Sequence, residues 1–343
     1  MTKNNIFSSS ELSNADYIKS QTTASTYYSS GDQWYPDWNM DKVTEKSGVY
    51  QRHIAGENET AYDLSVKACD QLFQTNNKND IDGIIYCTQS PDYIMPSNSF
   101  LLHNYLNLKN RVFAFDFNHA CTGYIYGLAM ANAFVSVGMA KEILLVTADT
   151  YSKYIYPKDR STRVLFGDGA AATIVKESNE RRGIIDIALG SAGSVYNKFW
   201  IPAGGLRLPK SDSTSMEIED DGGNKRTQND IEMDGFGVWS FINSVAPKQI
   251  DRLLKQNKVE KTDVDQFIFH QASKMTLESI IRLMNLNEEH VFINIQNIGN
   301  TVSSSIPIAL KDALDQHKVE IGSTLILSGF GVGLSYGAIL MEF

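Results

Sequence analysis

The chain is organised around one segment, Asp116-Phe117-Asn118-His119-Ala120-Cys121-Thr122-Gly123-Tyr124. The residues just before it, 112–115, are apolar and rich in aromatic side chains, which predicts a buried strand. After it, small and apolar residues continue to Met139 without a proline, which predicts a long buried helix. Cys121 is therefore expected at a corner between a strand and a helix.

This position gives Cys121 two interpretations. At a helix N-terminus, the unpaired backbone N–H groups and the helix dipole favour negative charge. A thiol placed there is expected to shift toward the thiolate, its nucleophilic form. A buried unpaired cysteine can also serve only as a small packing residue. The segment by itself leaves both interpretations open.

The composition is that of a globular protein, and it narrows the possible partners. The 343 residues carry a net charge of −9, with a sequence pI of about 5.2. An acidic chain is a poor candidate for binding the nucleic-acid backbone. The polar N-terminus has no signal-peptide segment, and no apolar run is long enough to span a bilayer, so we expect no membrane partner. The three widely spaced cysteines have neither metal-ligand nor disulfide spacing, which favours the reducing cytoplasm and predicts no metal site.

Apolar runs alternate with helical patterns along the chain, which predicts an α/β fold with buried parallel strands. Residues 1 to about 50 are polar, and we expect short helices and loops there. Predicted strands cover residues 81–88, 112–115, 143–148, 170–175, 184–189, 267–269, 291–293, 325–327 and 336–341. Predicted helices include one capped by Thr60 and running to Phe73, one carrying 100–106, and others at 241–254, 273–284 and near Pro307.

The second half of the chain repeats the strand–helix order of the first, which suggests a duplicated core. We place the division between residues 1–178 and residues 179–343. A polar, Gly- and Asp-rich excursion at 204–230 is too long for an ordinary turn, and it is interpreted as a substrate-side loop or a flap.

Two polar residues in the second half are candidates for chemistry. His270 ends the strand 267–269, at the strand end where α/β enzymes place their sites. Its alternative interpretation is a core histidine whose hydrogen bonds are satisfied. Asn300 lies between Gly299 and a run of hydroxyl residues, where an asparagine commonly forms a turn or a helix cap.

The glycine-rich segment 329–333 is expected to be a loop between two strands, and on its own it is weak evidence for a function. It lacks the following helix and the acidic residue that a dinucleotide site requires. Glycines there do allow a ligand to approach the backbone, and backbone N–H groups could face an oxyanion.

Taken together and in this order, these segments resemble the β-ketoacyl-acyl carrier protein synthase III family of the thiolase fold. The resemblance runs from about residue 46 to residue 343. It rests on Ser90-Pro91-Asp92-Tyr93, Ala120-Cys121-Thr122-Gly123, Phe166-Gly167-Asp168-Gly169-Ala170, Met233-Asp234-Gly235, His270-Gln271-Ala272, Gly299-Asn300-Thr301 and Gly329-Phe330-Gly331.

The resemblance implies a fold and a set of partners. The fold would be two pseudo-repeated α/β halves with buried mixed sheets and central helices, in αβαβα layers. It would form a homodimer and use coenzyme A or acyl carrier protein thioesters as substrates, with no further cofactor and no metal.

The resemblance also implies a reaction. Cys121 would take an acyl group from a thioester. His270 and Asn300 would hydrogen-bond the thioester carbonyl of a malonyl-type substrate, whose decarboxylation leaves an enolate. Attack of that carbanion on the Cys121-bound acyl group gives a 3-oxoacyl thioester, with the backbone N–H groups of Cys121 and Val332 holding the second oxyanion.

Several substrate-side positions depart from the family pattern. Ser273 replaces the usual asparagine after His270-Gln271-Ala272, and Met275 stands where a basic residue is expected, with Lys274 beside it. Lys46 takes the place of an arginine, whereas Arg160 is kept. Lys46, Arg160 and Lys274 correspond to positions that meet the pantetheine arm or the carrier. Met95 stands where the family often has a phenylalanine that lines the partner subunit's acyl pocket. Its alternative interpretation is an ordinary packing residue.

These departures favour a specialised pathway, such as a polyketide, a signal molecule or a surface-glycan acyl group, over fatty-acid initiation. An acyltransferase that moves the Cys121-bound group to an alcohol or amine is the alternative enzyme. Asn300 argues against it, because plain acyl transfer forms no enolate. A degenerate, non-enzymatic subunit is a third interpretation, opposed by the presence of all three polar groups.

Overall fold

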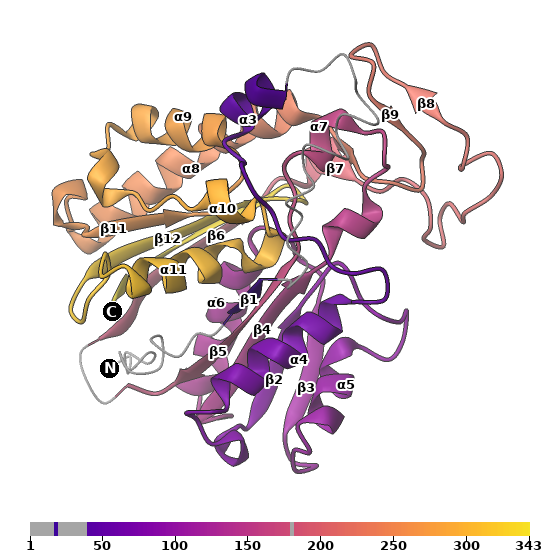
Figure 1. Ribbon diagram of the computed structural model, residues 1–343. Coiled ribbons are helices and arrows are strands. Elements are labelled where there is room, and N and C mark those ends of the chain that lie inside the picture. The colour runs from indigo at the N-terminus through magenta and orange to yellow at the C-terminus, as the bar shows by residue number, and fades with distance from the viewer. Residues whose placement is uncertain (1–16, 20–39, 179–181) are drawn as a thin grey trace.

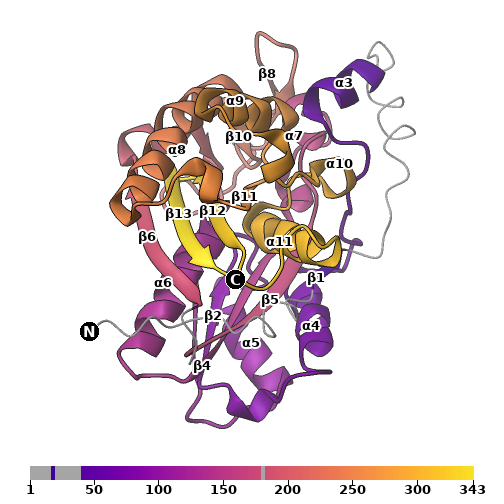
Figure 2. The ribbon, with the colours of Figure 1, turned by 90° about the vertical axis from the view of Figure 1, so that its left-hand side faces the viewer.

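The structure is a computed structural model that describes residues 17–19, 40–178 and 182–343. Most of the short helices and loops predicted for the first fifty residues lie outside the described residues. The described chain forms five stacked layers, in which two sheets each lie between helices (Figure 1). Figure 2 shows the same stack turned by 90°, with the N-terminal half below and the C-terminal half above.

The sheet of the N-terminal half has five strands in the order β1-β5-β4-β2-β3. Its strands are β1 (Tyr17–Lys19), β2 (Gly83–Cys87), β3 (Phe113–Phe117), β4 (Glu142–Asp149) and β5 (Gly169–Lys176). Strand β2 pairs in parallel with both β3 and β4, whereas β5 runs antiparallel to β4 and to β1. The carboxyl ends of β4, β2 and β3 therefore lie side by side at one edge of this sheet.

The sheet of the C-terminal half has four strands in the order β11-β12-β13-β6. Its strands are β6 (Gly183–Ser191), β11 (Gln266–Phe269), β12 (Thr324–Gly331) and β13 (Ser335–Glu342). Only β11 and β12 are parallel, because β13 runs antiparallel to both of its neighbours. Both sheets are thus mixed. The resemblance implied mixed sheets, whereas the alternation of apolar runs predicted only parallel strands.

Two helices fill the layer between the sheets. Helix α6 (Gly123–Ser136) follows Cys121, and helix α11 (Ser305–Asp315) occupies the matching place in the C-terminal half. Their apolar residues, such as Leu128 and Leu310, join one buried cluster with residues of both sheets, including Leu145 and Leu327. This shared core holds the two halves together and fixes the start of α6 at their junction.

Two further pairs of helices cover the outer faces of the sheets. Helices α4 (Ala61–Leu72) and α5 (Asn98–Tyr105) pack on the N-terminal sheet, and helices α8 (Gly235–Asn257) and α9 (Lys274–Met284) pack on the C-terminal sheet. The predicted Thr60 cap is confirmed, because its side chain accepts the backbone N–H of Asp63 in a capping box. Ser273 caps α9 in the same way, by accepting the N–H of Thr276. Burial of one apolar face of each helix is the main source of its stability.

The remaining elements are short. They include the helices α3 (Met40–Ser47), α7 (Arg160–Arg163) and α10 (Ile295–Ile298), and the two-residue strands β7 (Phe199–Trp200), β8 (Ile218–Glu219), β9 (Lys225–Arg226) and β10 (Glu232–Met233). The 3₁₀ turns are η1 (Lys78–Asp80), η2 (Tyr151–Tyr154), η3 (Gly193–Lys198), η4 (Lys261–Asp263), η5 (Glu288–His290) and η6 (Val302–Ser304). The excursion predicted at 204–230 forms an extended arm closed by the β8–β9 pair, which projects from the C-terminal half (Figure 1).

Three local expectations are corrected by the structure. Residues 291–293 form no strand, because only Val291 makes an isolated bridge to Phe267. Strand β3 is the half-buried edge of its sheet rather than a buried strand. The glycine-rich segment 329–333 is mostly strand, since β12 continues to Gly331.

The division at residues 178/179 stays a prediction. Within the described residues, no helix is both long and apolar enough to cross a membrane.

Candidate active site

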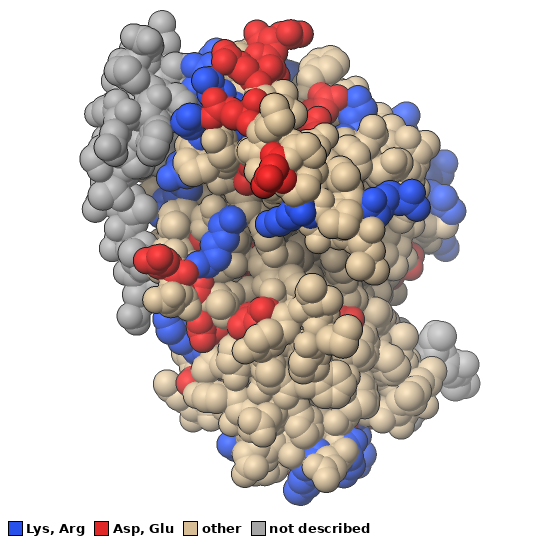
Figure 3. All heavy atoms as spheres, turned by 90° about the vertical axis from the view of Figure 1, so that its right-hand side faces the viewer, with Lys and Arg blue, Asp and Glu red and all other residues tan. Residues whose placement is uncertain are grey.

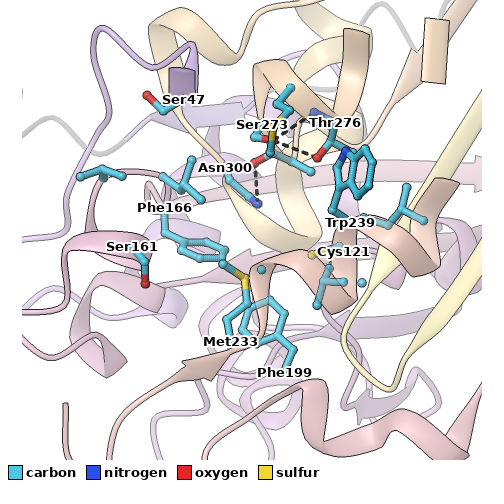
Figure 4. A pocket seen from close by; sticks show the side chains of 18 of the residues that line it. Ser47, Cys121, Ser161, Phe166, Phe199, Met233, Trp239, Ser273, Thr276 and Asn300 are labelled. Carbon is cyan, nitrogen blue, oxygen red and sulfur yellow. Dashed lines mark hydrogen bonds between the residues drawn. The ribbon is translucent and has the colours of Figure 1, made fainter. Parts of the chain in front are cut away.

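One cavity of about 340 Å³ brings together Cys121, His270 and Asn300. Cys121 lies two residues before α6, His270 follows β11, and Asn300 lies two residues after α10. Figure 4 shows Cys121 and Asn300 reaching the same cavity from different elements, beside Phe199 and Met233. The three side chains that the sequence singled out therefore meet at the junction of the two halves.

Glycines allow the two halves to approach closely at this junction. The backbone N–H of Asn300 donates to the carbonyl oxygen of Leu165 at 2.8 Å, and that of Gly167 donates to the carbonyl of Asn300 at 3.0 Å. A Cβ on Gly167 would lie 2.4 Å from the carbonyl oxygen of Ile298, and one on Gly299 would lie 2.8 Å from that of Leu165. Both contacts are too short for any side chain, which explains why these sequence motifs carry glycine.

The thiol of Cys121 is enclosed by backbone. A Cβ built on Gly331 would lie 2.8 Å from the Cys121 Sγ, so β12 passes directly against the sulfur. Cys121 is 2% exposed. Burial raises the pKa of the Cys121 thiol to about 12, and the charge of Asp149 contributes less. Hydrogen bonds from the backbone N–H groups of Cys121 and Val332 to the sulfur lower this pKa, but by less than burial raises it.

The expected shift of Cys121 toward thiolate is therefore wrong for the free protein. A pKa raised this far keeps the Cys121 thiol protonated near neutral pH. Loss of water around the sulfur outweighs the N–H groups at the start of the helix. The proton must then leave as a substrate is attacked, rather than beforehand.

His270 is a buried, neutral imidazole. Its backbone N–H donates to the carbonyl of Ser328 at 2.8 Å, which fixes the residue at the end of β11. Its ring meets Phe330 edge to face, with centroids 5.9 Å apart. Burial lowers the pKa of His270 to about 3, and its Nδ1 atom has no hydrogen-bond partner among the described residues. A neutral ring of this kind can donate one hydrogen bond to a substrate oxygen.

The carboxamide of Asn300 is oriented by the turn that follows it. The backbone N–H of Val302 donates to Asn300 Oδ1 at 3.0 Å. Val302 has a positive φ of 54°, an unfavourable conformation for a β-branched residue that brings its N–H back toward Asn300. The Nδ2 group makes only a long contact of 3.5 Å to the carbonyl of Ala272, so it remains available as a donor.

The predicted substrate-binding residues fall into two groups. Lys46 and Arg160 line the mouth of the cavity, and Arg160 also donates to the carbonyl of Gly222 at 2.8 Å, in the projecting arm. Lys274 does not line it: its side-chain stem packs over Gly48, and its Nζ lies 3.8 Å from Glu278. Met95 lies outside the cavity and is 79% exposed on the loop between β2 and α5. The roles of all four residues stay predictions.

Sequence reasoning missed part of the cavity wall that α8 supplies. Trp239 lines the cavity, and its buried indole Nε1 has no hydrogen-bond partner among the described residues. The predicted helix began at residue 241, whereas α8 begins at Gly235, where Asp234 caps it by accepting the N–H of Gly237 at 2.8 Å. The segment Met233-Asp234-Gly235 contained this signal, since aspartate is a favoured N-cap residue.

Comparisons with known proteins agree with this geometry. Residues 115–193 match the family model described as 3-oxoacyl-[acyl-carrier-protein] synthase III, and residues 254–343 match the model of its C-terminal part. The β-ketoacyl-[acyl-carrier-protein] synthase III of Aliarcobacter butzleri is 33% identical over 97% of this chain and 93% of its own length. The chain belongs to the β-ketoacyl-[acyl-carrier-protein] synthase III family. It is accordingly an acyltransferase of the condensing-enzyme class.

Other synthase III proteins are similarly close. The enzyme of Campylobacter curvus is 35% identical over 90% of both chains. A crystal structure of a 3-oxoacyl-(acyl-carrier-protein) synthase III superposes with a TM-score of 0.94, at 35% identity, covering 99% of this chain and all of the other. The thiolase-like layered fold implied by the sequence motifs is therefore confirmed for this synthase III.

Proposed function

We propose that this synthase III first transfers an acyl group from a thioester to Cys121. The sulfur attacks the thioester carbonyl carbon, the bond from that carbon to the carrier sulfur breaks, and the carrier leaves as a thiol with the proton that Cys121 loses. The N–H groups of Cys121 and Val332 act on the sulfur in the free protein, and we propose that they hold the oxyanion of the tetrahedral intermediate.

The second step is a decarboxylating condensation. A malonyl-type thioester binds with its carbonyl oxygen between His270 and Asn300, and loss of carbon dioxide leaves an enolate there. The enolate carbon attacks the acyl carbonyl on Cys121, a carbon–carbon bond forms, and the bond to Cys121 Sγ breaks to release a 3-oxoacyl thioester. Removing one donor of such an oxyanion site typically costs about 100- to 1,000-fold in rate.

The observation that carries the proposal is the meeting of Cys121, His270 and Asn300 in one cavity. A neutral His270 supports it, because a neutral imidazole donates a hydrogen bond to the enolate oxygen without being a strong acid. The hydrogen bond from Val302 supports it as well, since it directs the carboxamide of Asn300 so that its donor remains free. Acyl transfer to an alcohol or amine needs neither feature.

The carriers that we propose are coenzyme A and acyl carrier protein, whose pantetheine arms bear phosphate groups. Lys46 and Arg160 at the cavity mouth provide positive charge where such an arm would enter. Because Met275 lines the mouth at the position of a usual basic residue, we propose a specialised pathway rather than fatty-acid initiation. Cys69, Cys87 and Cys121 are buried and form no disulfide, which supports a cytoplasmic location. We propose no cofactor besides the thioester substrates.

We also propose a homodimer formed through strand β3 and its surroundings. Strand β3 is a sheet edge, and the neighbouring segments expose Ile94, Met95 and Phe100. Figure 3 shows that the N-terminal half, in the lower part of that view, carries few charged side chains on the face toward the viewer. A sheet edge with few charged side chains around it is the sort that a second copy covers. Light scattering on the purified protein would give the mass of a monomer if this proposal is wrong.

One experiment tests the reaction. The protein is incubated with acyl-coenzyme A, and its intact mass is measured. A malonyl thioester is then added, and carbon dioxide and the product mass are recorded. We expect Cys121→Ala to abolish acyl loading, whereas the control Cys69→Ala, which truncates another buried thiol far from the cavity in the α4 cluster, should load normally. Loading without carbon dioxide from any malonyl donor would favour the acyltransferase alternative.

A further inference from the structure

A second cavity, of about 200 Å³, adjoins the first. It shares Phe199 with the first cavity, and it is lined by Val332, whose backbone N–H acts on the Cys121 sulfur. Cys121, His270 and Asn300 line only the first cavity. In the proposed reaction, the malonyl-type thioester occupies the first cavity, so the acyl group on Cys121 would pass Val332 to reach the second.

The size of this cavity limits the acyl group. A cavity of about 150 Å³ is large enough for benzene, so 200 Å³ holds roughly six to eight non-hydrogen atoms. Phe199, Trp200, Ile201 and Ile231 supply apolar walls. Apolar walls alone would select a short hydrocarbon chain.

One wall of the cavity is polar, however. The Tyr151 hydroxyl donates to Gln89 Oε1, and Gln89 Nε2 donates to Asn118 Oδ1 at 2.6 Å. These residues follow the carboxyl ends of β4, β2 and β3, which are neighbours in the sheet. The three side chains thus form a continuous row of hydrogen-bonding groups along the cavity, which we call the polar row.

Buried contacts hold Gln89 and Tyr151 of the polar row in place, whereas Asn118 is exposed. The backbone N–H of Gln89 donates to Asp149 Oδ1 at 2.8 Å, and Asp149 is fully buried. Tyr151 is 3% exposed and packs against Phe166 and Phe199, with ring centroids 5.4 and 6.4 Å away. Groups fixed in this way recognise a ligand at a lower entropic cost than mobile side chains do.

The bonds within the polar row leave a definite pattern of free groups. The one hydroxyl hydrogen of Tyr151 is used by Gln89, and one of the two Gln89 amide hydrogens is used by Asn118. The second Gln89 hydrogen and the Asn118 amide group remain as donors, while the Tyr151 oxygen keeps its acceptor capacity. No lysine or arginine is among the described residues that line this cavity, so nothing there would neutralise a carboxylate.

We propose that the acyl group loaded on Cys121 is a short hydroxyacyl group, whose hydroxyl bonds to the polar row. A hydroxyl oxygen accepts from the amide of Gln89 or Asn118, and its hydrogen donates to the Tyr151 oxygen. A plain alkyl chain offers the polar row no hydrogen bond inside the cavity, and a site built to bond a hydroxyl discriminates strongly against the analogue that lacks it. This inference rests on the proposed function and specifies its acyl substrate.

The test compares loading of the full-length protein with butyryl-, 3-hydroxybutyryl-, 4-hydroxybutyryl- and succinyl-coenzyme A. The rate of Cys121 acylation is followed by intact mass, and kcat/KM by thiol release in the presence of a malonyl thioester. We expect one of the hydroxybutyryl groups to load at least about tenfold faster than butyryl, which corresponds to one or two hydrogen bonds. Succinyl should load most slowly, because its charge is unpaired in the cavity.

Two variants separate the polar row from a general effect on the fold. Tyr151→Phe removes only a hydroxyl, and Gln89→Leu replaces the amide with an apolar group of similar size. Both should lower the ratio of hydroxybutyryl to butyryl loading by about tenfold. Tyr156→Phe is the matched control: its hydroxyl bonds Glu217 outside both cavities, so the ratio should stay at its original value. A melting curve of each variant checks its folding.

The outcomes distinguish this inference from the proposed function. If butyryl loads as fast as both hydroxybutyryl groups and the variants leave the ratio unchanged, the inference is overturned while the condensation stands. If one variant fails to fold, the ratio measured with the other decides. If no thioester acylates Cys121, the proposed function fails, and the hydroxyacyl assignment fails with it.

Discussion

The carboxylate of Asp149 accepts the backbone N–H of Ser303 at 3.3 Å and its hydroxyl at 2.5 Å, across 154 positions of sequence. Asp149 ends β4 in the N-terminal half, whereas Ser303 belongs to the turn that follows Asn300. The same carboxylate accepts the N–H of Gln89. One buried side chain therefore fixes loops on both sides of Cys121.

We expect Asp149→Asn and Ser303→Ala to be coupled. The asparagine presents an NH₂ group to at least one donor, so a buried hydrogen bond is lost, and the free energy of unfolding should fall by about 1–3 kcal/mol. Ser303→Ala removes the hydroxyl bond alone. Urea unfolding of both single variants and the double variant measures the interaction. Simple additivity of the two losses would contradict the direct contact.

The pH dependence of decarboxylation follows from the state of His270. Burial lowers its pKa to about 3, below the ordinary value of 6.5, so the ring is neutral throughout the range above pH 4. The variant Cys121→Ala isolates decarboxylation from acyl loading. We expect its rate of carbon dioxide release from a malonyl thioester to be flat between pH 5 and 8. A decline below about pH 6.5 would show that His270 titrates normally in the protein.

Asn300→Asp tests separately the hydrogen bond that the Asn300 side chain accepts from Val302 and the one that it is proposed to donate to the enolate. The aspartate keeps an oxygen for the Val302 N–H, but it replaces the amide donor with a charge that repels the enolate. Decarboxylation should fall by about 100- to 1,000-fold. Acylation of Cys121, measured by intact mass, should remain, because it needs no enolate. Equal losses in the two steps would mean that Asn300 has a structural role only.

Gly331→Ala should displace the sulfur of Cys121. The added methyl carbon would lie 2.7 Å from Cys121 Cβ and 2.8 Å from Sγ, and strand backbone cannot move aside cheaply. We expect acylation to fall by at least about tenfold, since a shift of 1 Å at a reacting centre can cost 100-fold. The control is Gly193→Ala, whose added carbon meets nothing within 4 Å. Normal acylation of Gly331→Ala would show that β12 does not confine the sulfur.

The part of the site that the sequence predicted depends on local patterns. The apolar run before Cys121 and the small residues after it predicted both the strand and α6, because strand and helix periods can be recognised in a single segment. The same holds for His270 at the end of β11. No local pattern predicts that these residues meet. That expectation came from the order of the short motifs, which matches the family.

The parts that could not be predicted depend on contacts between distant segments. The raised pKa of Cys121 results from burial by β12 and from the charge of Asp149, neither of which the sequence around Cys121 reveals. Residues 291–293 have a strand-like composition, but tertiary packing leaves them a single bridge. Likewise, the polar row joins three residues that follow strands and are brought together only by the order of β4, β2 and β3.

The pairing of β13 with β6 has a consequence for biosynthesis. Ser335 of β13 lies opposite Ser191 of β6, and the Ser335 hydroxyl contacts Thr122 Oγ1 at 2.8 Å, beside Cys121. The wall next to the sulfur therefore exists only after β13 has been synthesised. Until then, the nascent polypeptide contains Cys121 without the wall that β13 supplies. A polypeptide that ends before β13 should therefore be inactive rather than partly active.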